Sequence, residues 1–128
     1  MKTLNLTQHA GSVEQKVVEP SADQKRIILS LITFDDIPSP EEMKQRALQL
    51  AEIALQSGCN AAMIGGAPYF QAPLERALLE KSVIPLYAFS KRESVDETLA
   101  DGTIRKTSVF RHAGWVAPYG NPKGDALP

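Results

Sequence analysis

Three short polar segments carry the side chains best suited to chemistry, and each follows an apolar, strand-like stretch. Residues 7–11 read Thr-Gln-His-Ala-Gly, residues 65–69 read Gly-Gly-Ala-Pro-Tyr, and residues 90–94 read Ser-Lys-Arg-Glu-Ser. The carboxyl ends of parallel strands meet at one edge of a sheet, where open α/β proteins bind their ligands. We therefore expect the three segments to converge on one binding site.

His9 is the candidate catalytic residue, because imidazole is the side chain that gains or loses a proton near neutral pH. Thr7 and Gln8 precede it directly and are candidate ligand contacts. A single histidine after a strand is more often a structural group or a ligand contact than a general acid or base. The sequence leaves these roles of His9 open.

Gly65 and Gly66 are candidate ligand contacts, because glycine lets the backbone approach a ligand closely. Backbone N–H groups at such a turn, together with the start of the next helix, are suited to holding a phosphate. The pair lacks both the Gly-x-Gly-x-x-Gly spacing and the lysine of the known nucleotide-binding loops. A plain tight turn after a buried strand explains the two glycines equally well.

Ser90, Arg92 and Ser94 are further candidate ligand contacts. A guanidinium group can hold a phosphate or carboxylate through two parallel hydrogen bonds, and the two hydroxyl groups would add donors. The alternative is a solvated connection in which Glu93 neutralises one of the cations.

The residues between these segments predict alternating strands and helices. Ser39, Pro40 and Glu42 fit a capped helix start, and Gly58 fits a helix end. The apolar run at 60–65 is typical of a central buried strand. Strands are expected at residues 2–7, 60–65 and 83–89, a short helix from residue 12, a helix (or, alternatively, a strand) at residues 22–32, and helices at residues 40–58 and 73–81.

Short links between parallel strands and helices predict an α/β, three-layer Rossmann-like domain with a parallel core of about three strands. The dipeptide Asp101-Gly102, which is favoured in type I′ turns, adds a C-terminal antiparallel β-hairpin with strands at 94–99 and 103–112. Residues 1–117 would form this single domain. Residues 118–128 are rich in turn formers and are expected to be a flexible tail.

Composition narrows the class of partner and the compartment. The chain of 128 residues has a formal net charge of −1, which makes nucleic acid and anionic membranes poor partners. Its single cysteine, Cys59, cannot form an intramolecular disulfide and suits a reducing cytoplasm. No apolar run approaches the roughly 20 residues of a membrane span. Two histidines and one cysteine at unsuitable spacings predict no metal site, and no cofactor is expected.

The second strand of the predicted hairpin carries several basic side chains. These are Arg105, Lys106, Arg111 and His112. They form a local basic face, or they keep an edge strand from aggregating. Both interpretations stay open.

The first strand and the helix start after it resemble those of a known family. Residues 4–9, Leu-Asn-Leu-Thr-Gln-His, and residues 12–15, Ser-Val-Glu-Gln, resemble the opening of small CRISPR-associated ring nucleases. That family also begins with a Leu-Asn strand, a histidine and a Thr/Ser-x-Glu-Gln helix start. The resemblance implies a Rossmann-like dimer that binds and cleaves cyclic oligoadenylates across a two-fold axis, with His9 and the basic loop facing a phosphodiester.

These observations predict a protein that binds a nucleotide or another phosphorylated ligand at the carboxyl edge of its sheet. Cleavage of a cyclic oligonucleotide would make it a phosphodiesterase, and a homodimer is the expected assembly. The alternative is a non-enzymatic, dimerising interaction module. The sequence leaves both hypotheses open.

Overall fold

Strand β2 (Ala61–Met63) lies at the centre of the parallel part of the sheet, between β1 (Thr3–Asn5) and β3 (Ile84–Thr98). The computed structural model describes residues 1–124 and 126–128. Strand β4 (Ile104–Val116) pairs antiparallel with β3 and completes a four-stranded sheet in the order β1-β2-β3-β4. The prediction of a parallel core with an added antiparallel hairpin is confirmed.

The first two helices begin at the residues that the sequence indicates. Helix α1 (Ala22–Ile32) follows a capping box at Ser21, and the strand alternative for this segment is wrong. Helix α2 (Pro40–Gln56) is capped by Ser39, whose hydroxyl accepts from the backbone of Glu42. The expected short helix after Ser12 is the 3₁₀ turn η1 (Val13–Gln15).

Helix α3 (Pro68–Glu80) begins five residues earlier than the predicted start at residue 73. Proline is favoured at the first position of a helix, where its missing N–H leaves no bond unmade. The chain contains two prolines that fit this position, and Pro68 takes it while Pro73 lies inside the helix. Gly66 and Ala67 therefore lead directly into the helix.

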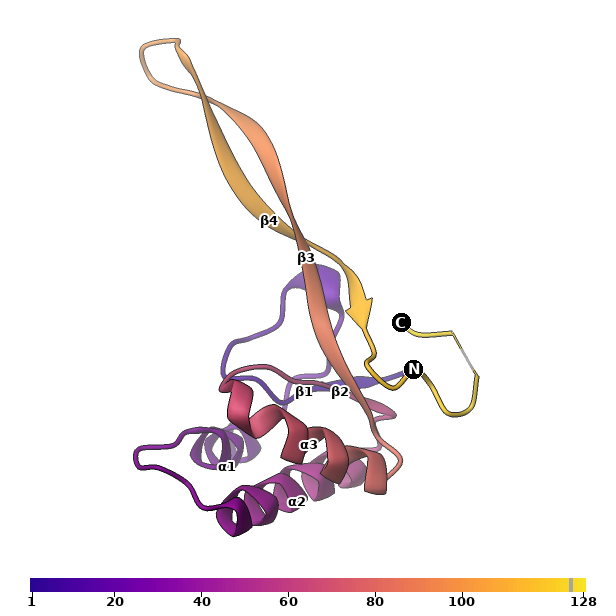
Figure 1. The fold of residues 1–128 in the computed structure, drawn as a ribbon. Helices are drawn as coiled ribbons and strands as arrows, with labels where there is room; N and C mark the ends of the chain where they lie inside the picture. Colours follow the sequence, from indigo (N-terminus) through magenta and orange to yellow (C-terminus); the bar gives the residue numbers. More distant parts are fainter. Residues whose placement is uncertain (125) are drawn as a thin grey trace.

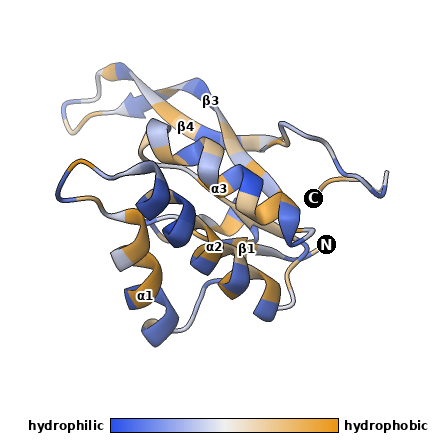
Figure 2. Cartoon of the chain, turned by 60° about the horizontal axis from the view of Figure 1, so that its bottom comes forward, coloured by the Kyte–Doolittle hydropathy of each residue, from blue (hydrophilic) through white to orange (hydrophobic). Residues whose placement is uncertain are grey.

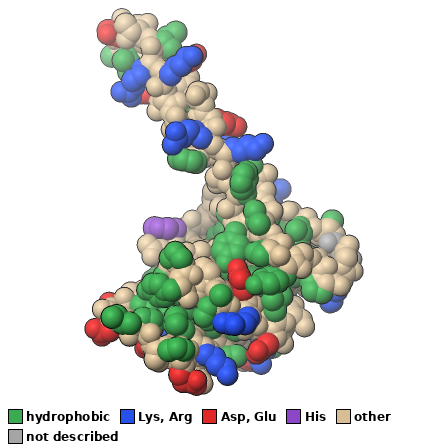
Figure 3. Space-filling model, viewed as in Figure 1, with side chains coloured by type: hydrophobic (Ala, Val, Ile, Leu, Met, Phe, Trp, Pro, Cys, Tyr) green, Lys and Arg blue, Asp and Glu red, His purple; other side chains and the backbone are tan. Residues whose placement is uncertain are grey.

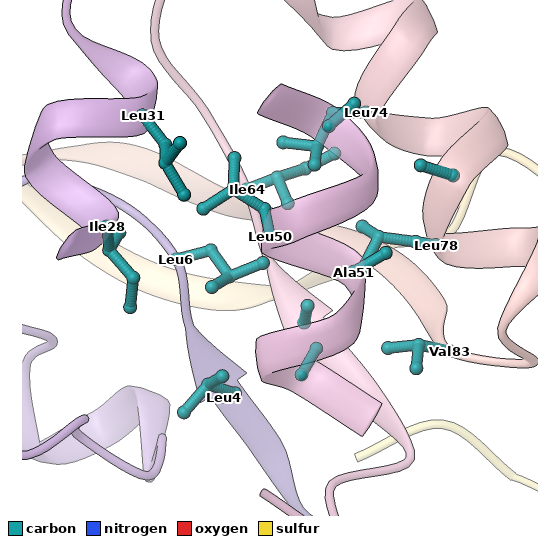
Figure 4. Close-up of a cluster of buried hydrophobic side chains, with 14 of the residues drawn as sticks. Leu4, Leu6, Ile28, Leu31, Leu50, Ala51, Ile64, Leu74, Leu78 and Val83 are labelled. Carbon is teal, nitrogen blue, oxygen red and sulfur yellow. The ribbon is translucent and has the colours of Figure 1, made fainter. Parts of the chain in front are cut away.

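The three helices of the described residues all lie on one side of the sheet (Figure 1). Hydrophobic and hydrophilic residues alternate along each of them, as in amphipathic helices (Figure 2). The main core fills the space between sheet and helices. In it, Leu4, Leu6 and Ile64 meet side chains from all three helices, among them Ile28, Leu31, Leu50, Leu74 and Leu78 (Figure 4).

On the other face of the sheet, among the described residues, there is no layer of α-helices. Ala61, Ile84 and Leu86 form a small buried cluster there, against which Trp115 and Ala117 pack. The fold is a mixed α/β domain, and the predicted three-layer Rossmann-like arrangement is not confirmed.

Strands β3 and β4 continue far beyond the sheet and project from the body as a twisted two-stranded ribbon (Figure 1). The two strands stay in register from Tyr87 opposite Val116 to Thr98 opposite Ile104, with one bulge between Phe89 and Ser90. We call residues 90–112, beyond this bulge, the β-arm.

The β-arm corrects two predictions. The strand that was expected to end at Phe89 runs on to Thr98, so residues 90–94 are part of a strand and the prediction of a loop is wrong. The turn also differs from type I′, because Gly102 has a φ of 86° whereas Asp101 is not in the positive-φ region. A glycine in the left-handed conformation after a type I turn is the usual form of a three-residue hairpin loop.

Candidate functional site

A cleft of about 570 Å³ opens at the carboxyl ends of the three parallel strands. The segments that follow β1 and β2 form two of its walls, and Tyr87 and Ala88 of β3 contribute the third. Of the residues that the sequence predicted, the cleft brings together Thr7, Gln8, His9, Gly65 and Gly66. The expected convergence therefore holds for the first two of the three polar segments.

His9 lies exposed at this cleft. Its Nε2 atom is 3.3 Å from Nε2 of the Gln8 amide. This contact is a hydrogen bond in the tautomer whose Nε2 accepts from the Gln8 amide. The imidazole is thus accessible to a ligand at this cleft.

A buried amide holds the segment around His9 in place. Asn5 is fully buried, and its Nδ2 donates to the carbonyl oxygen of His9 at 2.7 Å and to both carboxylate oxygens of Glu19 at 3.0 and 3.1 Å. Its Oδ1 accepts from the backbone N–H and the hydroxyl of Thr7, at 2.9 and 2.7 Å. Glu19 also accepts from the backbone of Gly11 at 2.7 Å. One amide side chain therefore fixes the turn that presents His9.

Sequence reasoning missed Asn5 and Glu19 as positioning residues. The available signal was an amide between Leu4 and Leu6, in a strand whose residues are all buried. Buried polar groups are almost always hydrogen-bonded, so an asparagine at such a position indicates a local network. Lys25 of α1 also contributes, since its Nζ donates to the Thr7 carbonyl at 2.6 Å.

The second wall of the cleft joins the glycine pair to the start of α3. Gly66 has a φ of 113°, a conformation that other residues rarely adopt, whereas the backbone of Gly65 is unstrained. No side chain caps the N-terminus of α3 at Ala67. Pro68, the first residue of α3, has no N–H, and the N–H of Phe70 donates to the Ala67 carbonyl at 3.1 Å. The wall therefore favours an anionic or hydrogen-bond-accepting group through the backbone of the glycine pair and the partial positive charge of the helix start.

Tyr87 closes the third wall as a neutral phenol. Its hydroxyl donates to Oε2 of Glu75 at 2.5 Å, and Tyr119 donates to Oε1 of the same carboxylate at 2.9 Å. Burial, followed by the bond to Glu75, raises the pKa of Tyr87 above its ordinary value of 10.0. The bond to Glu75 likewise raises the pKa of Tyr119. Tyr87 is therefore protonated at neutral pH and is suited to positioning rather than to acting as a base.

Ser90, Arg92 and Ser94 lie on the β-arm and do not line the cleft. Their cross-strand neighbours are His112, Phe110 and Ser108, respectively. The guanidinium carbon of Arg92 lies 5.4 Å from the centroid of the Phe110 ring. That they contact a ligand stays a prediction, and the cleft of a single chain gives it no geometric support.

The comparisons with known proteins place the chain in a family. Residues 1–116 match the model of the Uncharacterized protein MJ1673 family. The chain belongs to this family. The search of curated proteins found no match to the chain, and neither did the search of solved structures.

The matched residues end at Val116, the last residue of β4, and so include both the cleft and the β-arm. Within the described part of the chain, no three His, Cys, Asp or Glu side chains gather as a metal site would require. In the same residues, no helix has the length and apolar character needed to cross a membrane.

Proposed function

We propose that the cleft binds the phosphate group of a nucleotide or of another phosphorylated small molecule. The observation that carries this proposal is the start of α3. Helices α1 and α2 are each capped by a serine side chain, whereas α3, which begins at the cleft, has no such cap. The backbone of Gly65, Gly66 and Ala67 lines the cleft directly before α3, so its N–H groups would face the ligand and the helix start would add its partial positive charge.

Helix N-termini preceded by glycines are recurrent phosphate sites, because the N–H groups and the helix dipole act on the same anion. Among the described residues that line the cleft, none is Lys or Arg. The backbone would therefore supply most of the attraction to a bound phosphate group. The volume of about 570 Å³ falls in the usual range for small-molecule sites.

His9 gives the site a group that can transfer a proton. It lines the same cleft as Gly66, and its side chain is exposed and held on a fixed turn. If the bound group is a phosphodiester, the imidazole is suited to protonate the leaving oxygen or to activate the attacking hydroxyl. The resemblance of residues 4–9 and 12–15 to ring nucleases supports cyclic oligoadenylates as the first class of phosphodiester to examine.

Thermal unfolding in the presence of candidate ligands tests the proposal. Inorganic phosphate, adenosine monophosphate, a cyclic dinucleotide and a cyclic oligoadenylate would be compared at matched ionic strength. A ligand at 100 times its Kd stabilises the protein by about 2.7 kcal/mol, which raises Tm by roughly 10 °C for a domain of this size. No shift with any of the four would contradict the proposal.

Two substitutions locate the effect. A Cβ at Gly65 would meet only the Thr7 methyl group, at 3.9 Å, so Gly65→Ala should fold normally while adding a methyl group to the wall of the cleft. We expect it to reduce the ligand-induced shift. The control is Lys91→Ala on the β-arm, outside the cleft, which should leave that shift unchanged. His9→Ala should retain ligand binding and abolish any cleavage of a cyclic oligoadenylate.

A further inference from the structure

The β-arm is a two-stranded ribbon whose two faces are largely exposed to solvent. An isolated hairpin is marginally stable in water unless a third strand, a helix or another molecule covers it. Phe110 is 69% exposed, and Ile104 is 66% exposed. The partly shielded residues within the arm are only Val95, Leu99, Thr107, Val109 and His112. Charged and hydrophobic side chains are interspersed along the projection (Figure 3).

The two sides of the ribbon differ in how many of their charged side chains form ion pairs within the chain. On one side Arg111 pairs with Glu93 at 2.8 Å, and Arg105 pairs with Glu97 at 2.7 Å. Arg111 also lies 3.9 Å from Glu14 of η1, which ties this side to the body. The cations on this side are thus mostly neutralised within the chain.

The opposite side, which we call the Phe110 face, is built from alternate cross-strand pairs because directly opposed residues share one side of a ribbon. From base to tip these pairs are Ser90 with His112, Arg92 with Phe110, Ser94 with Ser108, Asp96 with Lys106, and Thr98 with Ile104. Among the ion pairs of the described residues, none includes Asp96 or Lys106. Arg92 contacts the Phe110 ring and, in the same part of the chain, pairs with no carboxylate.

The order of these pairs makes the Phe110 face complementary to a reversed copy of itself. The small pair Ser94 and Ser108 lies in the middle, with Arg92 and Phe110 on one flank and Asp96 and Lys106 on the other. A second arm, turned end for end about the row of Ser94 and Ser108, places its Asp96 carboxylate opposite Arg92. The same rotation places its Lys106 ammonium group opposite Phe110. Both contacts are favourable, the first as an ion pair and the second as a cation–π interaction.

We propose that two copies of this chain associate through the Phe110 faces of their β-arms, antiparallel and around a two-fold axis at Ser94 and Ser108. Each contact then occurs twice, as a closed isologous interface requires. A ribbon of this length spans about 30 Å at ~3.4 Å per residue and is about 10 Å wide. The footprint of about 300 Å² per chain is well below the roughly 800 Å² per partner of a standard interface, so the dimer should be weak, with a Kd on the order of 100 µM. This inference does not depend on the proposed ligand.

Sedimentation velocity over a range of protein concentrations tests the dimer. Arg92→Asp and Asp96→Arg each turn both ion pairs of the dimer into like-charge contacts, so each variant alone should dimerise at least about tenfold more weakly. In an equimolar mixture the introduced aspartate of one chain faces the introduced arginine of the other, while the native Asp96 faces the native Arg92. The mixture should therefore recover the affinity of the wild type.

The matched control is Lys91→Asp, which makes the same change of charge on the neighbouring residue but on the other side of the ribbon. It should leave dimerisation within about twofold of the wild type. Circular dichroism of each variant checks that the fold is retained, and recovery in the mixture also excludes misfolding as the cause. A wild type that stays monomeric at about 1 mM, roughly ten times the expected Kd, would overturn the proposal. So would a mixture no more dimeric than its components.

Discussion

Replacing Asn5 by alanine should destabilise the protein strongly and loosen the turn that presents His9. The substitution removes the donor to His9 and Glu19 and the acceptor for Thr7, all from a fully buried side chain. Net contributions are about 1 kcal/mol for a neutral hydrogen bond and about 1.5–3 kcal/mol for one to a charged group. Because some freed groups lie near the surface and can bind water, we expect a loss of about 3 kcal/mol in the free energy of unfolding.

The measurement is urea denaturation together with amide hydrogen exchange. The N–H groups of Thr7 and Gly11, which bond to Asn5 and Glu19 respectively, should exchange faster in the variant. Asn60→Ala is the matched control, because Asn60 is exposed and its side chain, within the described part of the chain, accepts a single long hydrogen bond of 3.4 Å from the backbone of Lys2. It should change stability by less than about 0.5 kcal/mol. An Asn5→Ala protein as stable as this control would refute the role given to the amide.

Two further predictions concern the other walls of the cleft. The raised pKa of Tyr87 means that the folded state holds the phenolic proton more tightly than the unfolded state. The stability that this proton contributes is complete below about pH 10 and is lost as the pH rises above it. Urea unfolding should therefore show a steeper alkaline loss of stability for the wild type than for Tyr87→Phe, and parallel curves would contradict this. Gly66→Ala should cost about 1–2 kcal/mol because its φ of 113° strains any other residue. Gly65→Ala should cost less than about 0.5 kcal/mol in the same assay, and equal losses for the two variants would show that strain is not the cause.

The helices and the parallel strands could be predicted from the sequence because their signals are local. Ser21 and Ser39 mark helix starts because their hydroxyl groups accept hydrogen bonds from backbone N–H groups of the first helical turn, and both helices start as expected. The apolar run around Ala62 marks a strand buried on both faces, and β2 is central. Where two signals competed, as at Pro68 and Pro73, local rules could not choose between them.

The β-arm could not be predicted beyond its turn, because its stability depends on pairing rather than on a hydrophobic face. Residues 90–94 are polar on both sides of the ribbon, so they lack the alternation by which a half-buried strand is recognised. The bulge after Phe89 then shifts the register, which hides the continuity of β3. Asn5 was missed for a related reason, since its partners Thr7 and Glu19 are brought together only by the folded turn.

Strand β3 connects the two surfaces for which we propose roles. Tyr87 and Ala88 line the cleft, the bulge follows at Phe89, and the β-arm begins at Ser90. An interface between arms would therefore restrain a strand within a few residues of the ligand. Binding free energies are reciprocally linked, so any effect of dimerisation on ligand affinity must equal the effect of ligand on dimerisation. The Arg92→Asp variant separates the two surfaces, because it weakens the arm contact while leaving every residue of the cleft in place.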